Sequence, residues 1–371
     1  MKNIFISCFA FDDGKSGISN YIENTLYHLA KENNLFVMIL KKDIKNYTRK
    51  HKNIHFISVP NILEKPILNM IFHLFIMPFF ITKKYDFIFL PAGNRRLMSF
   101  YPIYTVVTVH DLSQYSVEEK YSFLRMFYIK RVIPFFLKPV DKIIAVSQNT
   151  KDDLIKYFDI EENKIVVNYN GFDKSLFQSE KKDKITMKIK FDIEKEYLLY
   201  TARIEHPGKN HLNLIKAYEL LPHDLKERFD LVFVGVAKEN AQVVFDYINK
   251  SSDKNNIKFL GFVSNKDLPI IYANAELFVF PSFYEGFGIP LVEAMAMKLP
   301  VLSATNSSLL EIGENVAYYF DEYDPKSIKD AIIHIANNKE KQTVMIKRGL
   351  EKLNKFDWRS HGNKIIEQCK H

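Results

Sequence analysis

The chain has 371 residues, of which 47% are apolar and 26% charged, and it carries a formal net charge of +8. This composition is typical of a soluble globular protein and excludes a largely disordered or coiled-coil chain. The length predicts two domains, each large enough to bury a core. Cys8 and Cys369 are the only cysteines and lie at opposite ends. We therefore expect a cytoplasmic protein with neither a disulfide framework nor a cysteine-based metal site.

Two apolar stretches bear on whether the chain enters a membrane. Met1–Ala10 has a lysine and a short apolar run, but no small-residue cleavage site follows, so it predicts a buried first strand and not a signal peptide. Ile67–Ile81 is shorter than the ~20 residues that span a bilayer. It also contains Asn69, His73 and Pro78. We expect a buried or interfacial helix there.

Positive charge is concentrated in the first half of the chain. Residues 1–180 contain 24 Lys and Arg against 18 Asp and Glu. One basic run extends from Lys41 to Lys52, and a second stretch, Lys120–Lys142, interleaves basic and aromatic residues. This pattern suits an anionic membrane surface, although a solvated helix face over core aromatics would produce it equally well. No nucleic-acid-binding module accompanies the charge, so we expect no nucleic acid partner.

Short apolar runs alternate with helical patterns along the whole chain, which predicts parallel sheets covered on both faces. The first series of expected strands is Asn3–Phe9, Leu35–Leu40, Ile54–Val59, Phe87–Leu90, Thr105–Val109 and Lys142–Val146. The second is Tyr197–Ala202, Asp230–Val234, Ile257–Leu260, Leu277–Phe280 and Val301–Leu302, with helices such as His211–Leu221 and Ile289–Met297 between strands. The charged stretch Ser179–Lys188 is the expected linker. The predicted fold class is α/β, with two tandem Rossmann-like doubly wound domains facing a cleft.

The segment Pro281–Met297 is the most informative motif. Glu285 is followed by Gly286 and Gly288, and then by a helical pattern with a proline in its first turn. The glycines allow backbone N–H groups to face a ligand, and a helix N-terminus favours phosphate. Glu293 lies farther along, where its carboxylate can accept hydrogen bonds from vicinal hydroxyls. A structural alternative is that Glu285 caps the helix and Glu293 pairs with a lysine.

A second motif, Thr201–His211, also follows an expected strand and precedes a helix. It places Arg203 and Lys209 on either side of a Pro207–Gly208 turn. Two cations at the carboxyl end of a strand suit a diphosphate, which arginine binds bidentately and lysine as a point charge. The alternative is a pair of surface salt bridges, each worth ~0–1 kcal/mol.

Two further segments place polar residues at the ends of expected strands. His110 and Asp111 follow the run Thr105–Val109, at the crevice edge of an open sheet. A histidine in such a place is a core residue about as often as a catalytic one. In Asp13–Asn20, Gly17 opens a helical pattern, and its loop can approach a ligand.

Several well-known motifs are missing. Gly14-Lys15-Ser16 resembles the end of a P-loop, but Phe9 occupies the position of the first glycine. No Gly-x-Gly-x-x-Gly follows the first expected strand, which disfavours a nicotinamide oxidoreductase. The chain also lacks Asp-x-Asp, His-Glu-x-x-His and Gly-x-Ser-x-Gly motifs. We therefore expect no metal site.

Taken together, these motifs resemble the retaining glycosyltransferases of family 4, a group with the GT-B fold. Glu285 and Glu293 form its Glu-x7-Glu pattern. The accompanying matches, in the family's order, are Arg203 with Pro207–Asn210, Val109–Asp111, Val146–Ser147 and Asn170–Asp173. The resemblance extends from about Gly17 to Trp358.

The resemblance implies roles for individual residues. The implied donor-binding set is Gly17, Arg203, Lys209, Glu285, Gly286, Phe287, Gly288, Ile289, Leu291 and Glu293, and the implied catalytic set is His110, Arg203, Lys209 and Glu285. Within these sets, Arg203 and Lys209 hold the donor diphosphate and Glu293 holds the ribose. Glu285 binds hydroxyls of the donor sugar, and His110 lies near the transferring carbon. Gly17 keeps the N-terminal loop close to the diphosphate.

The resemblance also implies a division of labour and a set of partners. Residues 1–180 bind the acceptor, residues 190–354 bind the nucleotide sugar, and residues 355–371 form a helix that crosses back to the N-terminal domain. The donor is a GDP- or UDP-linked hexose, with a mannosyl-type transfer favoured. The basic, aromatic first half suits a glycan or lipid-diphosphate-linked acceptor in O-antigen, capsule or lipopolysaccharide synthesis. Such an enzyme works in the cytoplasm, with peripheral contact at the inner face of the cytoplasmic membrane.

The residue types agree with this chemistry. Breaking a sugar–phosphate bond develops negative charge on the departing diphosphate, which fixed cations stabilise most in the transition state. Arg203 and Lys209 would do this in place of a divalent ion, so no cofactor is expected. Two alternatives remain open: a GT-B-fold epimerase acting on a nucleotide sugar, and a non-catalytic homologue that only binds nucleotide.

Overall fold

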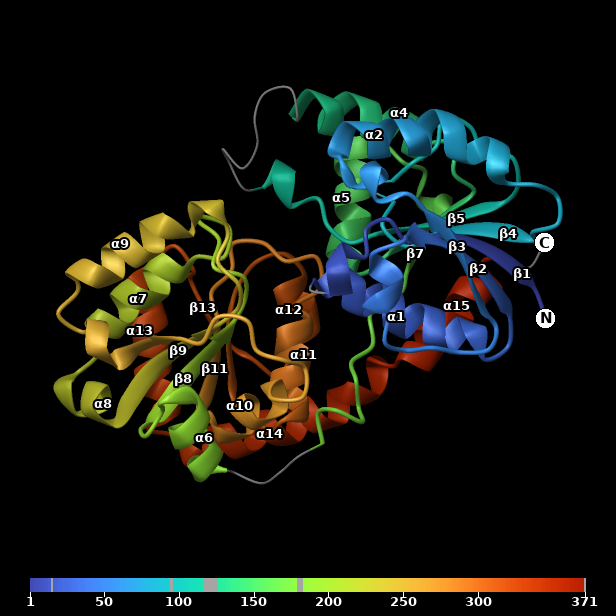
Figure 1. Ribbon diagram of the computed structural model, residues 1–371. Coiled ribbons are helices and arrows are strands. Elements are labelled where there is room, and N and C mark those ends of the chain that lie inside the picture. Colours follow the sequence, from blue (N-terminus) through green and yellow to red (C-terminus); the bar gives the residue numbers. More distant parts are fainter. Residues whose placement is uncertain (15, 94–95, 117–125, 179–182, 370–371) are drawn as a thin grey trace. The chain divides into compact units, whose positions relative to one another are not determined.

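The computed structural model describes residues 1–14, 16–93, 96–116, 126–178 and 183–369. These residues form two compact units. The first contains residues up to 114, residues 126–171 and the C-terminal residues from 357 onward; the second is formed chiefly by residues 172–356. Each unit is an α/β layer structure with its own parallel sheet (Figure 1).

The sheet of the first unit has seven parallel strands in the order β3-β2-β1-β4-β5-β6-β7. The strands are β1 (Asn3–Ser7), β2 (Asn34–Leu40), β3 (Ile54–Val59), β4 (Phe87–Leu90), β5 (Thr105–Val109), β6 (Lys142–Ala145) and β7 (Ile165–Val167). Ile4 lies opposite Leu35 on one side and Phe87 on the other, so β1 is a central strand. The six expected strands are confirmed within two residues. β7 was not among the expected strands.

The second sheet has six parallel strands in the order β10-β9-β8-β11-β12-β13. They are β8 (Glu196–Thr201), β9 (Phe229–Val234), β10 (Ile257–Phe259), β11 (Leu277–Phe280), β12 (Val301–Ala304) and β13 (Tyr318–Phe320). The chain runs outward from β8 to β10 and then returns to β11, which pairs with β8. Each unit is thus a doubly wound α/β sheet, which confirms the predicted fold class.

Helices cover both sheets. In the first unit they are α1 (Gly17–Ala30), α2 (Pro66–Ile71), α4 (Ile133–Leu137), α5 (Gln148–Phe158) and α15 (Trp358–Glu367). In the second unit they are α6 (Lys184–Phe191), α7 (His211–Glu219), α8 (His223–Arg228), α9 (Gln242–Lys250), α10 (Leu268–Asn274), α11 (Ile289–Ala296), α12 (Ser307–Gly313), α13 (Pro325–Ala336) and α14 (Lys339–Lys352). Helix α7 contacts α9 and α13, while α11 contacts α12 and α14, so two groups of helices form around the second sheet.

The expected linker is partly wrong. Residues 179–182 lie outside the described residues, but Lys184–Phe191 forms α6 in the second unit. Asp183 caps this helix by accepting a hydrogen bond from the Thr186 N–H at 2.9 Å. Met187 is buried and contacts the Tyr197 hydroxyl of β8. One apolar residue per turn on a lysine-rich helix is enough to hold it against the unit, and this signal is weak in the sequence.

The last helix of the chain, α15, belongs to the first unit, where it packs against α1 (Figure 1). The Asn168 amide donates to the backbone oxygen of His361 at 2.9 Å. Gly171 passes directly under Trp358, and a Cβ at Gly171 would lie 2.4 Å from the Trp358 backbone nitrogen. This close approach requires glycine and joins the end of the first half of the chain to its C-terminus.

No helix of the described residues is long and apolar enough to cross a membrane. The apolar stretch Ile67–Ile81 falls on α2, a π-helical turn (Phe72–Ile76) and a 3-10 turn (Met77–Phe80).

Substitution Gly171→Ala is expected to lower the stability of the first unit by about 2 kcal/mol, because the added methyl overlaps Trp358. Thermal unfolding followed by calorimetry measures the loss. Gly17→Ala is the matched control, since a Cβ at Gly17 would have no heavy atom within 4 Å. An equal melting temperature for Gly171→Ala and the wild type would contradict the close approach.

Candidate active site

The candidate site of the second unit lies where three parallel strands end. Strands β8, β11 and β12 are neighbours, and their carboxyl ends lead into the loops that carry the Arg203–Lys209 and Glu285–Gly288 motifs. The sheet changes direction between β8 and β11, and ligands of open α/β sheets bind at such a switch point. The two motifs, far apart in sequence, therefore start from adjacent positions.

Buried side chains tie the first two loops together. The Tyr200 hydroxyl donates to the backbone oxygen of Lys209 at 2.8 Å and lies 2.9 Å from the Ser282 hydroxyl. The backbone N–H of Phe283 donates to the Gly208 oxygen at 3.1 Å. Tyr200 and Ser282 are fully buried, so these bonds form in a low-dielectric environment where polar groups must be paired.

Asn210 makes a second connection. It is buried in the left-handed conformation, with a φ of 54°, immediately before α7. Its side-chain amide donates to the backbone oxygens of Pro281 at 2.9 Å and Glu322 at 2.8 Å. The Glu322 carboxylate in turn accepts from the Asn306 amide at 2.7 Å. Residues after β8, β11, β12 and β13 thus share one hydrogen-bonded network.

Lys209 and Glu285 meet directly. The Lys209 ammonium lies 2.7 Å from Oε1 of Glu285, and the two side chains are only 17% and 15% exposed. The Lys209 side chain is therefore mostly buried and is not a solvent-exposed cation. The hydrogen bonds of Tyr200 and Asn210 hold the loop that carries Lys209 against the edge of the sheet. The pair is also unlike the solvent-exposed salt bridges that contribute little to stability.

Arg203 is the more exposed of the two cations. Its guanidinium lies 3.4 Å from Glu205, and its side chain is 45% exposed. It extends from the same loop as Lys209, so both positive charges remain at the carboxyl end of β8. This placement leaves donors available to an anion from solvent.

Backbone contacts hold Glu285 in place. Its N–H donates to the Ser307 hydroxyl at 3.0 Å, and its backbone oxygen accepts from the Ser308 hydroxyl at 2.8 Å. These serines begin α12, which follows β12. The carboxylate can therefore face Lys209 while the main chain is fixed on the other side. The alternative that Glu285 caps α11 is not what the structure shows, since Gly288 is the residue that precedes that helix.

The glycine-rich loop ends in helix α11. Gly288 has a φ of +87°, which favours glycine, and a Cβ there would come within 3.0 Å of Leu309. Ile289 is the first residue of α11, Phe287 is buried beside Phe356, and Leu291 is fully buried. Phe287 and Leu291 thus serve packing, so any contact they make with a ligand comes from the backbone. Gly286 is half-buried in the same loop.

Glu293 lies in the buried face of α11. One carboxylate oxygen accepts a hydrogen bond from the Tyr272 hydroxyl at 3.0 Å, and that hydroxyl also lies 2.6 Å from the Thr201 hydroxyl. Burial raises the pKa of Glu293 to about 7, and the hydrogen bond from Tyr272 opposes this rise. The expected alternative, a lysine partner, is replaced by a tyrosine partner. The carboxyl group is poised to change protonation when a new donor reaches it.

The first unit holds His110 at the end of β5. Its Nε2 donates to the Pro91 backbone oxygen at 2.7 Å, and its ring contacts Tyr21 edge-on with centroids 4.6 Å apart. The Tyr21 hydroxyl bonds Thr108 at 2.8 Å and Nε2 of His361 at 2.9 Å. A residue of the last helix thus supports the tyrosine that packs on His110. His110 is half-buried and therefore accessible.

Gly17 is the first residue of α1, after the N-cap Ser16. It is exposed, its φ is ordinary, and a Cβ would meet nothing within 4 Å. The fold of the first unit therefore does not require glycine here. Open space at a helix N-terminus is compatible with the expected approach of a ligand.

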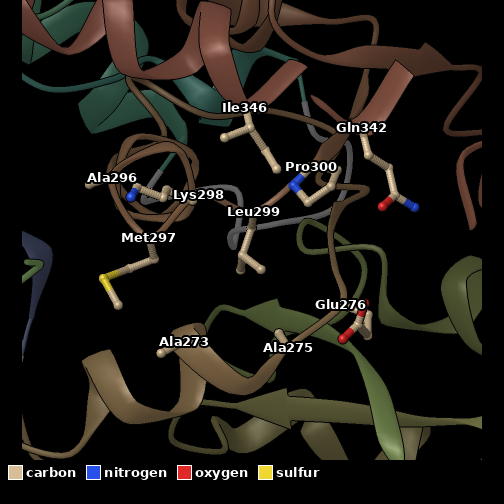
Figure 2. Close-up of a pocket in the computed structure, with 10 residues that line it drawn as sticks. All are labelled: Ala273, Ala275, Glu276, Ala296, Met297, Lys298, Leu299, Pro300, Gln342 and Ile346. Atoms are coloured by element: carbon tan, nitrogen blue, oxygen red, sulfur yellow. The ribbon is translucent and has the colours of Figure 1, made fainter. Parts of the chain in front are cut away.

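A pocket of about 330 Å³ lies elsewhere in the second unit (Figure 2). It is lined by residues that precede β11 and β12, among them Glu276 and Pro300, together with Gln342 and Ile346 of α14. Because it lies where strands begin, it is at the opposite edge of the sheet from the site described above.

Sequence reasoning missed the residues that organise the site. Tyr200, Tyr272, Ser282, Asn210 and Glu322 are buried polar residues that hold the loops or the carboxylates. The sequence presents Asn210 only as the last residue of the Pro207–Asn210 motif. A polar residue at the end of an otherwise apolar strand is the one signal that could have indicated Tyr200.

Comparison with known proteins identifies the class. The model of Glycosyltransferase Family 4 matches residues 15–176, and that of Glycosyl transferases group 1 matches residues 181–352. These matches cover most of both units. The chain belongs to glycosyltransferase family 4, has the GT-B fold, and is a hexosyltransferase.

Individual relatives and structures agree with this assignment. O-antigen chain mannosyltransferase B of Escherichia coli is 28% identical over 71% of this chain and 70% of its own length. Serotype-specific mannosyltransferase WbdA of Escherichia coli is 28% identical over 75% of this chain, which spans only 34% of that longer protein. The structure of Anabaena Alr3699/HepE in complex with UDP and glucose covers 99% of both chains with a TM-score of 0.76 and 19% identity, which supports the fold.

The variant Glu293→Gln is expected to gain stability relative to the wild type as the pH rises. In the folded protein this carboxyl has a pKa of about 7, above its ordinary value of 4.5. The stability that the protonated carboxyl contributes is therefore complete below pH 4.5 and is lost as the pH rises through 7. Glutamine keeps the acceptor oxygen without the charge. The difference in unfolding free energy should grow to about 3 kcal/mol above pH 7.

Calorimetry between pH 5 and pH 8 measures this difference. Glu351→Gln, at an exposed position of α14, should follow the wild type at every pH. A constant offset between Glu293→Gln and the wild type would show that Glu293 is ionised throughout.

Proposed function

We propose that this enzyme transfers a hexosyl residue, mannose in the favoured case, from a nucleoside diphosphate sugar to a surface-polysaccharide acceptor with retention of anomeric configuration. The observation that carries the proposal is the Lys209–Glu285 ion pair at the carboxyl ends of β8 and β11, together with the buried Glu293 of α11, the helix that follows β11. The mannosyl preference rests on the two Escherichia coli mannosyltransferases, both 28% identical to this chain.

The cations of the second unit would bind the leaving group. Arg203 is exposed enough to bind a diphosphate, and Lys209 can exchange part of its contact with Glu285 for a phosphate oxygen. The first N–H groups of α11 add partial positive charge. Charge that develops on the departing diphosphate is then stabilised by groups already in place. This arrangement needs no divalent ion, and we propose that the reaction is metal-independent.

The carboxylates would bind hydroxyl groups. Glu285, held through its backbone by Ser307 and Ser308, would accept from hydroxyls of the donor sugar. Glu293 would accept from the ribose. A hydroxyl that donates to Glu293 favours the charged carboxylate, so nucleotide binding would lower its pKa from about 7. Nucleotide affinity should therefore increase as the pH rises toward 7.

The first unit would supply His110 and the acceptor. The Pro91 oxygen fixes the Nε2–H of His110, which orients the ring and places Nδ1 on its other side. Tyr21 and His361 prevent the ring from turning. We propose a position for His110 near the transferring carbon, Gly17 near the diphosphate, and a glycan or lipid-diphosphate-linked acceptor of the O-antigen, capsule or lipopolysaccharide type. The enzyme would then work in the cytoplasm, peripherally at the inner face of the cytoplasmic membrane.

The nucleotide base would be read near Phe262. This side chain is 60% exposed in a turn where the Gly261 oxygen accepts from the Gly235 N–H at 2.9 Å. Gly235 follows β9, the neighbour of β8, so the turn lies at the same edge as Arg203. An exposed aromatic ring there can stack on a base.

Nucleotide binding is the first test. A thermal-shift series with UDP, GDP, UDP-glucose and GDP-mannose should give a clear rise in melting temperature with one nucleotide class, since a ligand at 100 times its dissociation constant adds ~2.7 kcal/mol. The donor selected in this way is then tested for transfer to lipid-linked glycan with and without EDTA. Activity lost in EDTA and restored by Mg²⁺ or Mn²⁺ would contradict metal independence. Conversion of free donor without acceptor would indicate an epimerase instead.

Lys209→Ala is expected to reduce kcat about 10²–10³-fold, as removal of a charge-stabilising donor does in other enzymes. Steady-state kinetics with the selected donor measure the change. Lys216→Ala, on the exposed side of α7 in the same segment, is the control and should behave as the wild type. Full activity of a folded Lys209→Ala variant would remove Lys209 from the mechanism.

A further inference from the structure

The segment from α2 to the 3-10 turn at Met77–Phe80 exposes a row of large apolar side chains. Its large apolar side chains face outward: Ile67 is 68% exposed, Phe75 is 55% and Phe79 is 74%. Ile71 completes a series at intervals of four residues, at 40% exposure. The π-helical turn at Phe72–Ile76 has more than 3.6 residues per turn, which keeps four-residue intervals on one face.

The buried side of this segment contains two polar residues, Asn69 and His73, among apolar ones. His73 is 1% exposed, and its ring nitrogens lie 2.8 Å from the Ser7 hydroxyl and 2.9 Å from the Asn69 backbone oxygen. The Asn69 side chain is also buried and donates to the Leu63 oxygen at 2.9 Å. A helix that meets only water on its outer side buries its apolar face and exposes its polar one. The outer face of this segment is therefore suited to an apolar phase.

The apolar face continues onto a second element. Phe79 contacts Phe100, whose ring centroid is 5.4 Å away and which is 44% exposed. On one side of Phe100, the Ser99 N–H donates to the Leu74 oxygen at 3.0 Å; on the other, the Tyr101 hydroxyl donates to the Phe136 oxygen at 2.7 Å. This loop thus joins the segment to the helical stretch at residues 127–137.

That helical stretch adds apolar and basic side chains. Phe127 is 57% exposed and Phe135 is 70% exposed. Lys130 and Arg131 are exposed on the same stretch. Residues 120–125 of the predicted basic and aromatic stretch lie outside the described residues. Scattered exposed apolar residues are ordinary, but a continuous set of this size marks an interaction surface.

We infer that this face, defined by Ile67, Ile71, Phe75, Phe79 and Phe100, docks on the surface of an anionic lipid bilayer. The stretch from Pro66 to Thr82 contains no charged residue, and it is bounded by Lys65 on one side and by Lys83 and Lys84 on the other. Apolar side chains enter the boundary between headgroups and acyl chains, and flanking lysines bind anionic headgroups. These lysines stay in water and so keep the apolar segment at the bilayer surface.

Charge favours a bilayer over a second copy of this chain. A two-fold contact places the same patch on both partners. The apolar stretch has no acidic residue to match its flanking lysines, and nearby Glu64 is paired with Lys42 at 2.5 Å. Two copies would bring positive charges together, whereas anionic lipid neutralises them.

Docking would place part of the first unit's site at the lipid surface. His73 and Phe72 contact Phe9, which follows the central strand β1. The carboxyl end of β1 leads to the loop before Gly17. The inference adds a defined surface to the peripheral location proposed above. It is tested by lipid binding alone, so it can fail independently of the transfer reaction.

The experiment is flotation of the full chain with vesicles of phosphatidylcholine alone and of phosphatidylcholine with 30% phosphatidylglycerol. The wild type should float with the anionic vesicles and lose binding as salt rises. The double variant Phe75→Ser with Phe79→Ser should bind at least about tenfold more weakly, because two exposed apolar anchors are lost. Lys83→Glu with Lys84→Glu should reduce both binding and its salt dependence.

The chain offers a matched control. Ile185 and Ile189 of α6, in the second unit, are 73% and 81% exposed and lie beside lysines. Ile185→Ser with Ile189→Ser should float as the wild type does. Three results would overturn the inference: no binding of the wild type to anionic vesicles, equal loss in both serine pairs, or a wild-type dimer that Phe75→Ser with Phe79→Ser converts to monomer.

Discussion

The pairing of Lys209 with Glu285 is the interaction on which the second unit's site depends. The two residues are 76 positions apart and meet because β8 and β11 are parallel neighbours at the switch point of the sheet. Alone, an ion pair at a sheet edge is weak and screened by solvent. The Lys209–Glu285 pair is stronger than such an ion pair, because the buried hydrogen bonds of Tyr200 and Asn210 hold both loops in register. The site is rigid because the polar groups beneath it are paired.

Buried polar groups also explain how the site can respond to a ligand. Glu293 has only the Tyr272 hydroxyl as a hydrogen-bond donor in the contacts described, and burial holds its pKa near 7. The cost of its charge is reduced when another donor arrives. In contrast, Lys209 and Glu285 already neutralise each other. In the proposed reaction, the diphosphate would compete for a cation that is held in position, and this preorganisation would favour the transition state over the ground state.

The first unit depends on a different kind of constraint, contact between the ends of the chain. Helix α15 supplies His361, which supports Tyr21 and through it the ring of His110. Gly171 permits this helix to pack closely. The segment around Phe75 has the opposite property, because a row of its large apolar side chains remains exposed. Helix α15 is thus held by specific contacts, whereas the segment around Phe75 leaves apolar side chains exposed on its outer face.

The spacing of apolar residues predicts the two parallel sheets, the positions of most strands and the segments that carry Arg203, Lys209, Glu285 and Glu293. The periodicity and the fraction of apolar residues are local properties of the sequence, so they can be recognised without knowledge of the fold. Tertiary packing places Lys209, which is mostly buried, against Glu285 and places Glu293 against a tyrosine. It also makes Lys184–Phe191 helical and leaves the apolar face around Phe75 pointing outward. These features depend on which residues meet across strands and on which side of a helix is covered, and a one-dimensional pattern does not contain that information.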